Sequence, residues 1–188
     1  MAKICVFCSS SENGISESYR KVARETGKLL GEDNHHLIYG GSHRGLMGEV
    51  SKTFAKYNNE ITEIIPKMWE NVIVEKENAI ITENLGERLQ KMQDYSDAFI
   101  TLPGGFGSLQ ETLDVLVAKQ LNLHQKPFAL VNTNEFYNSL LAQIKKTIYE
   151  GFAPKDNHLL LEVVDTPKQA LEYIENYTPI KISDKIHD

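Results

Sequence analysis

Short apolar runs and helical apolar stripes alternate along the whole chain. Seven runs rich in β-branched or aromatic residues predict strands, namely ICVFC (4–8), HLIY (36–39), ITEII (61–65), AIIT (79–82), AFITL (98–102), PFALV (127–131) and LLLEVV (159–164). Between them, apolar residues recur at helical spacing over 17–30, 45–56, 85–95, 109–121, 135–149 and 167–177. The chain therefore predicts repeated strand–helix units.

The predicted strands are apolar along most of their length instead of on alternate positions. Strands that helices cover on both faces have this property, and strand–helix repeats produce parallel strands. We therefore expect an α/β fold, a doubly wound, Rossmann-like parallel sheet of about seven strands with helices on both faces. One domain is expected over residues 1–177, with a loosely ordered C-terminal tail over 178–188.

Composition and charge exclude several classes of function. The chain has 188 residues, of which 41% are hydrophobic, and its formal net charge is −6. An acidic chain without a long basic run is not expected to wrap nucleic acid, because such binding neutralises many phosphates. The start MAKICVFCSS has the features of neither a signal peptide nor a membrane span. A cytoplasmic protein with no membrane partner is expected.

Cys5 and Cys8 form a CxxC spacing, which occurs in redox pairs and in metal sites. Both lie in the first predicted strand, where residues three apart point to opposite faces, so the two thiols should diverge. The six histidines are scattered along the chain. The sequence therefore predicts neither a metal site nor a cofactor.

Three loops that follow predicted strands are rich in glycine and serine: SSSENG (9–14), GGSHRG (40–45) and PGGFGS (103–108). The carboxyl ends of parallel strands meet at one edge of the sheet, where ligands bind. The unpaired N–H groups and the dipole at the start of each following helix favour an anion, which glycines let approach the backbone. The predicted phosphate-binding residues are Ser10, Gly40, Gly41, Gly104, Gly105, Gly107 and Ser108.

Each loop also has a purely structural interpretation. Glycine turns occur at many strand–helix junctions, and none of these loops has a Walker or G-x-G-x-x-G pattern. Ser108-Leu-Gln-Glu111 matches a capping box, in which Glu111 would only stabilise the start of a helix expected from residue 109. That interpretation accounts for the serine and the glutamate but not for three neighbouring glycines.

Several motifs together resemble the LOG family of cytokinin-activating phosphoribohydrolases, which is also labelled "lysine decarboxylase-like". The motifs are CVFCSSS near the start, YGGSHRGLMG (39–48), ERLQKM (87–92), PGGFGSLQE (103–111) and QLNLHQKPFALVN (120–132). The resemblance implies hydrolysis of the N-glycosidic bond of nucleoside 5′-monophosphates such as AMP or N6-modified AMP. It implies Arg88 and Glu111 as the catalytic pair and Met92 as a substrate-binding residue.

The resemblance also implies a homodimer or a multiple of one. The apolar stripe Leu109, Leu113, Leu116, Val117 and Leu121 is broad enough to serve both core and interface. The alternative function is a non-catalytic nucleotide or cofactor carrier of the same fold. Ser9, Ser42, Gly86, Leu89 and Gln110 depart from the family pattern. Ser42 would be strained if the usual glycine there needs a positive φ.

Overall fold

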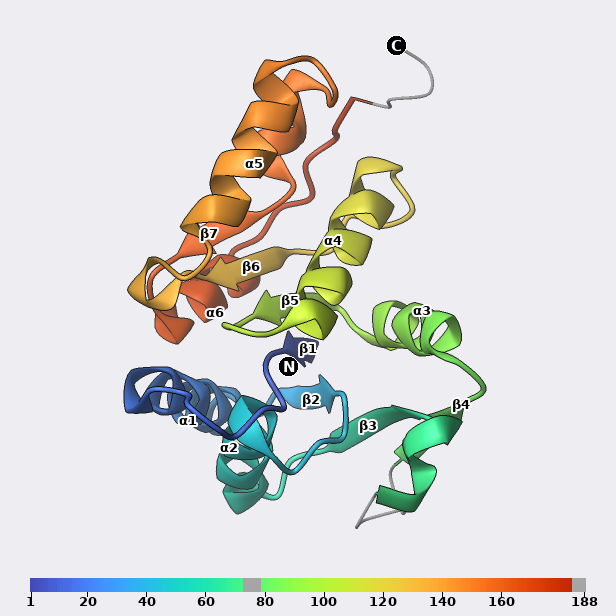
Figure 1. The fold of residues 1–188 in the computed structure, drawn as a ribbon, viewed down its shortest axis with the longest axis vertical. Coiled ribbons are helices and arrows are strands. Elements are labelled where there is room, and N and C mark those ends of the chain that lie inside the picture. The colour runs from blue at the N-terminus through green and yellow to red at the C-terminus, as the bar shows by residue number, and fades with distance from the viewer. Residues whose placement is uncertain (73–78, 184–188) are drawn as a thin grey trace.

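A computed structural model describes residues 1–72 and 79–183, and in these residues it contains a seven-stranded parallel sheet. The strand order is β4-β3-β2-β1-β5-β6-β7 (Figure 1). The strands are β1 (Lys3–Phe7), β2 (His36–Tyr39), β3 (Ile61–Pro66), β4 (Ala79–Thr82), β5 (Ala98–Thr101), β6 (Phe128–Val131) and β7 (Glu162–Val164). The order reverses between β1 and β5, which defines a doubly wound sheet.

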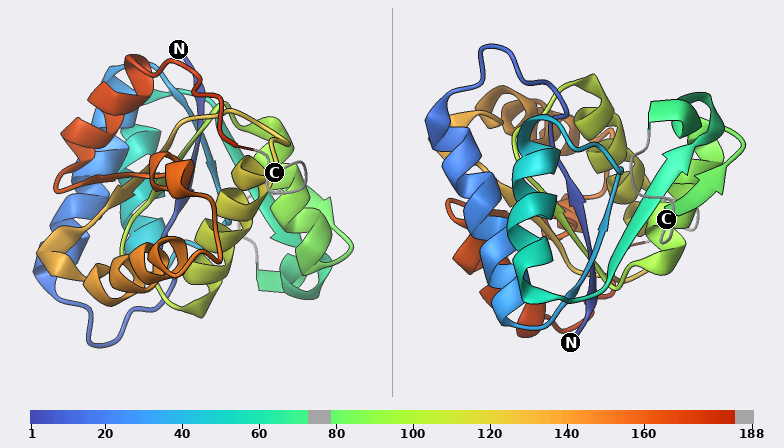
Figure 2. Two further views of the ribbon diagram at one scale, coloured as in Figure 1. Left: turned by 90° about the horizontal axis from the view of Figure 1, so that it is seen from above. Right: turned by 90° about the horizontal axis from the view of Figure 1, so that it is seen from below.

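Helices cover both faces of the sheet, as Figure 2 shows. They are α1 (Glu17–Glu32), α2 (Gly45–Phe54), α3 (Leu85–Tyr95), α4 (Phe106–Gln120), α5 (Asn138–Tyr149) and α6 (Pro167–Glu175). Short 3-10 turns are η1 (Ala55–Tyr57), η2 (Lys67–Val72), η3 (Thr133–Glu135) and η4 (Lys155–Leu159). The predicted fold class is confirmed.

Two apolar clusters form the core, one on each face of the sheet. The first packs residues of α1, α2 and α6 against β1 and its neighbours, and it includes Cys8. The second includes Cys5 and Phe7 together with Met92 of α3 and Val115 of α4. The two cysteines are buried, unpaired and on opposite faces, as the strand alternation predicted.

The last predicted strand is shorter than expected. Its first residue, Leu159, ends the 3-10 turn η4, and β7 contains only Glu162–Val164. β7 lies at the edge of the sheet, and its first two residues are exposed. The apolar run is therefore not buried along its whole length there. Leu160 instead turns into the second core cluster.

The C-terminal segment expected to be loose starts with residues that contact the domain. Ile182 is buried in the second core cluster beside Leu160. Both the backbone N–H and the hydroxyl of Ser183 donate to Asp156 Oδ2, at 2.6 and 2.7 Å. The rest of the expected tail, residues 184–188, lies outside the described residues. Among the helices of the described chain, none has the length and hydropathy required to span a membrane.

Helices α1 and α2 pack with unusually close backbones. A Cβ on Gly27 would lie well inside contact distance of the Val50 carbonyl oxygen and close to the backbone nitrogen of Phe54. By contrast, α5 has no fully buried residue and covers the sheet only with partly exposed side chains. The helix pair that follows β1 and β2 is therefore rigidly packed, whereas α5 is held loosely.

Gly27→Ala tests this close packing. The added methyl group would meet backbone atoms that cannot rotate away, and overpacking of this kind costs about 1–3 kcal/mol, or roughly 2–10 °C in Tm for a chain of this size. Thermal unfolding followed by circular dichroism measures the change. Gly86→Ala is the matched control, because its Cβ would meet only the Asn84 side chain at 3.3 Å. An equal or higher Tm for Gly27→Ala would contradict the packing.

Candidate active site

A cavity of about 800 Å³ lies at the carboxyl ends of β1, β2, β3 and β5. It is the edge of the sheet at which the glycine-rich loops gather. Eight of the ten predicted site residues line it, namely Ser10, Gly40, Gly41, Arg88, Gly105, Gly107, Ser108 and Glu111. The topology therefore brings together residues that are up to 101 positions apart, from Ser10 to Glu111.

Two predicted site residues are not in the cavity lining. Gly104 lies behind it, where a Cβ would collide with the Ser108 side chain and approach the Ser9 nitrogen to 3.3 Å. Met92 is buried under α3 in the second core cluster. Gly104 thus packs against Ser108, and Met92 occupies a core position. Their contact with substrate stays a prediction.

Helix α4 opens onto the cavity with free backbone donors. Gly105 is its N-cap, and within the described part of the chain no side chain caps this end. The first helical bond runs from the Leu109 N–H to the Gly105 carbonyl. A Cβ on Gly105 or Gly107 would meet nothing within 4 Å, so the protein's own packing does not require these glycines. Their open backbone suits the close approach of an anion.

The predicted capping box is wrong, because α4 starts at Phe106 and not at residue 109. Ser108 is therefore the third residue of the helix, and Glu111 lies in the second turn. The Ser108 carbonyl accepts from the Thr112 hydroxyl at 2.7 Å, and the Glu111 side chain turns away toward α3. Glu111 is thus not a helix cap.

Arg88 and Glu111 form a buried ion pair in the cavity wall. Arg88 Nη1 donates to Glu111 Oε1 at 2.8 Å, and the two side chains are 8% and 5% exposed. Arg88 Nε donates to the Ile64 carbonyl at 3.0 Å. A Cβ on Gly40 would collide with Arg88 Nη2, so the guanidinium packs closely against this glycine. The arginine is held from β3, from the loop after β2 and from α4 at once.

Burial raises the pKa of Glu111 above its usual value, and the charge and hydrogen bond of Arg88 oppose this rise. Burial and the nearby Glu111 carboxylate raise the pKa of Cys8. The pKa of Cys5 is raised in the same way. Both thiols therefore remain protonated at neutral pH.

The loop after β2 tolerates its serine. Gly41 has a φ of +76°, a conformation that favours glycine, whereas Ser42 is not among the residues with positive φ. The Ser42 hydroxyl accepts from the Arg44 N–H at 3.2 Å. The strain anticipated for a serine at this position does not occur.

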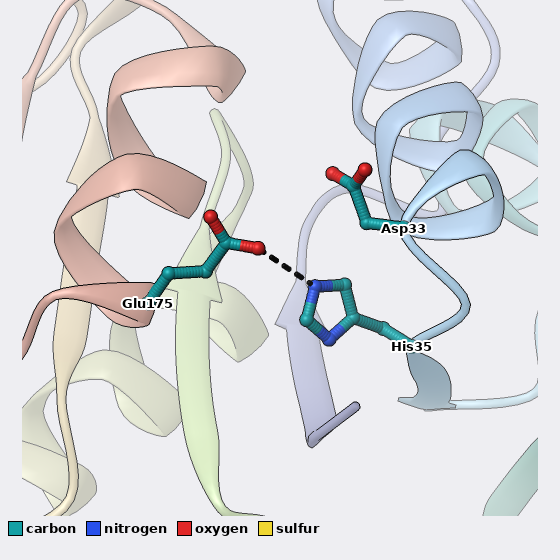
Figure 3. A group of neighbouring side chains, drawn as sticks. All are labelled: Asp33, His35 and Glu175. Carbon is teal, nitrogen blue, oxygen red and sulfur yellow. Dashed lines mark ion pairs between the residues drawn. The ribbon is translucent and has the colours of Figure 1, made fainter.

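A second group of ionisable side chains, Asp33, His35 and Glu175, lies at the opposite edge of the sheet (Figure 3). Their ligand atoms are within 4.8 Å of one another. His35 Nδ1 accepts from the Ala2 N–H at 3.2 Å, so in the neutral ring Nε2 carries the proton and points to Glu175 Oε1 at 3.7 Å. A protonated nitrogen cannot ligate a metal. This group links the start of β1 to the end of α6.

The sequence analysis did not predict the cavity residues at the end of β3 and in the turn after it. Ile65 and Trp69 line the cavity there, and Phe106 lies at its rim on α4. The sequence feature that could have indicated them is the stretch PKMW, in which the tryptophan comes four residues after the buried Ile65. It therefore lies at the carboxyl ends of the strands, as the three glycine-rich loops do.

Comparison with known proteins agrees with this geometry. A family model described as "Possible lysine decarboxylase" matches residues 47–174. A probable cytokinin riboside 5'-monophosphate phosphoribohydrolase of Oryza sativa subsp. japonica is 41% identical, over 94% of this chain and 72% of the relative. The chain belongs to the LOG family. A cytokinin riboside 5'-monophosphate phosphoribohydrolase of Arabidopsis thaliana is 38% identical over 94% of this chain and 83% of its own length.

Solved structures outside the LOG relatives share the fold. A molybdenum cofactor binding protein from Rippkaea orientalis superimposes with a TM-score of 0.70 at 22% identity, over 92% of this chain and 94% of the other. The Moco carrier protein from Chlamydomonas reinhardtii gives 0.66 at 19% identity, over the same shares. At these identities the likeness concerns the fold alone.

Arg88→Met tests the energetics of the buried pair in this LOG-family site. Removing one partner of a buried ion pair costs about 3–5 kcal/mol, because the other charge is left without compensation. In Arg88→Met/Glu111→Gln no carboxylate remains to be compensated, so part of the stability should return. Urea denaturation of the parent, both single variants and the double variant measures the coupling.

Arg20→Met is the matched control for this cycle. Arg20 pairs with Glu49 at 3.1 Å, and its side chain is 24% exposed against 8% for Arg88. Solvent-accessible pairs contribute about 1 kcal/mol or less, so a smaller loss is expected. If the double variant were no more stable than Arg88→Met, the loss would come from the Arg88 contacts with Ile64 and Gly40 and not from the unpaired carboxylate.

Proposed function

We propose that this protein hydrolyses the N-glycosidic bond of nucleoside 5′-monophosphates, giving free base and ribose 5-phosphate. The observation that carries the proposal is the buried Arg88–Glu111 pair in the wall of a cavity onto which the uncapped start of α4 opens. A phosphate-binding helix end beside a buried carboxylate is the arrangement that this reaction needs.

The backbone N–H groups at the start of α4 and the Ser108 hydroxyl would bind the 5′-phosphate. This contact anchors the substrate and supplies binding energy for the step at the sugar. α2 offers a second helix start beside the cavity: its N-cap is Arg44, with no side-chain cap in the described residues. Ser10 of the loop after β1 lies in the same lining.

Cleavage passes through an oxocarbenium-like state at the ribose, so positive charge develops on the sugar ring. Glu111 would stabilise that charge or orient the attacking water through the ribose hydroxyls, while Arg88 fixes its Oε1. Water adds to the anomeric carbon and loses a proton. The glycosidic electron pair leaves with the base, which takes up a proton.

The substrate class follows from the relatives. Those named above are called cytokinin riboside 5'-monophosphate phosphoribohydrolases, so we infer AMP or an N6-modified AMP as substrate. The alternative, a carrier that binds a nucleotide or cofactor without cleaving it, needs the phosphate-binding loops but has no use for the buried carboxylate beside the sugar.

Adenine release from AMP is the direct test. The parent protein should release adenine from AMP and leave adenosine intact, because the phosphate supplies much of the binding energy. Glu111→Gln should bind AMP yet lose on the order of a hundredfold or more in turnover, because the amide carries no charge. Chromatography of the products measures both. AMP binding by the parent without any adenine release would support the carrier.

The outward row of α4 supports a homodimer. Leu113, Val117 and Leu121 are each more than a third exposed, whereas Leu116 on the adjoining row is buried. Helix α3 lies alongside and is joined to α4 by the 2.6 Å hydrogen bond from Gln93 Nε2 to Asp114 Oδ2. A repeating apolar row of this kind is self-complementary across a two-fold axis, so a second copy of this chain is the partner that we propose for it.

Light scattering at micromolar concentration tests this assembly. The parent should have twice its chain mass of 21.3 kDa or a multiple of that. Leu113→Asp/Val117→Asp should give a monomer, because it buries two charges in the interface. Phe152→Asp, which alters an exposed apolar side chain beyond α5, is the matched control and should leave the mass unchanged. A monomeric parent would contradict the proposal.

A further inference from the structure

One wall of the cavity has no part in holding the phosphate or the catalytic pair. Ile65 is the last residue but one of β3, Trp69 follows in the 3-10 turn η2, and both line the cavity. Trp69 is 45% exposed. A cavity-lining tryptophan with nearly half of its surface exposed offers a large aromatic surface to a ligand.

The strand order determines what this wall can reach. The phosphate-binding start of α4 follows β5, and Trp69 follows β3, with β1 and β2 between them. Three strand spacings separate the two ends of the cavity, which is about 14 Å. A nucleoside monophosphate in extended form spans a comparable length, so one molecule can contact both ends.

The catalytic pair lies between these two ends. Glu111 comes from α4, and Arg88 is tied to β3 through the Ile64 carbonyl, one residue before Ile65. A substrate whose phosphate lies at α4 and whose ribose lies at Glu111 must therefore direct its base past Arg88 toward Ile65 and Trp69. Met47 of α2 adds a further apolar side chain to the cavity lining.

We propose that Trp69 forms the base subsite and that its indole ring stacks on the purine of the substrate. This inference rests on the proposed function for the position of phosphate and ribose. Stacking recognises the flat face of the base and not the hydrogen-bonding groups on its edge. Trp69 therefore favours purine over pyrimidine monophosphates, and it leaves the purine edge free to carry an apolar substituent beside Ile65.

The chain contains one tryptophan, so its fluorescence reports this subsite alone. In the slow variant Glu111→Gln, AMP should change the Trp69 emission with saturation, because the adenine stacks on the indole. Ribose 5-phosphate, which has the phosphate but no base, should bind without that change. Equal changes with both ligands, or calorimetric binding of AMP with no change in emission, would overturn the proposal.

Kinetics of Trp69→Ala give a second readout. The KM for AMP should rise on the order of tenfold to a hundredfold, as loss of one base–aromatic stack implies, while kcat changes by a few-fold at most. Trp69→Phe should retain most of the affinity. Met68→Ala is the matched control, because Met68 is an exposed neighbour on the same turn outside the cavity lining. An unchanged KM in Trp69→Ala, or a change in oligomeric mass, would overturn the subsite.

The two proposals fail in different ways. If AMP alters the emission but no adenine is ever released, the hydrolase proposal fails and the base subsite stands. If adenine is released normally while Trp69→Ala leaves KM unchanged, the hydrolase stands and the subsite is wrong.

Discussion

The site depends on the burial of one charge pair. Glu111 and Arg88 are both almost inaccessible to solvent, and each compensates the cost of burying the other. A buried carboxylate alone would take up a proton, because burial raises its pKa. The charge and the hydrogen bond of Arg88 oppose this rise and so favour the ionised form. An ionised Glu111, held by Arg88 beside the cavity, can stabilise positive charge that develops in a reaction without reorganising.

Holding the guanidinium requires contributions from three parts of the sheet. Ile64 supplies a carbonyl from β3, Gly40 after β2 leaves the space that Arg88 Nη2 occupies, and Glu111 comes from α4. Glycine is therefore present at different positions of the site for different physical reasons. Gly40 and Gly104 leave room for side chains of the protein itself, whereas Gly105 and Gly107 face open space. Only the second kind points directly to a ligand.

The fold could be predicted well because its signal is local and repeated. Each strand is a short apolar run and each helix a periodic stripe, and a parallel sheet follows from their alternation. The sequence-based predictions were less accurate at positions where tertiary contacts determine the helix start or the direction of a side chain. Nothing in the sequence separates Ser108 as a cap from Ser108 within the first turn, because the start of α4 depends on Gly105 taking the N-cap position. Met92 likewise follows Arg88 by one helical turn, yet it faces the core. Trp69 was overlooked because its loop has no glycine signature, and only the strand order shows that it faces the phosphate loops across the cavity.

The loose attachment of α5 affects how this protein can diverge. None of its residues is fully buried, and the two strands beside it, β6 and β7, contribute nothing to the cavity lining within residues 1–72 and 79–183. A helix with few buried contacts contributes less to the stability of the domain than a helix that is buried in the core. Ile144 of α5 packs against the second core cluster, so changes there would reach the core. The exposed positions of α5 can instead accumulate changes, or acquire new contacts with other molecules, while the chemistry at the other half of the sheet stays as it is.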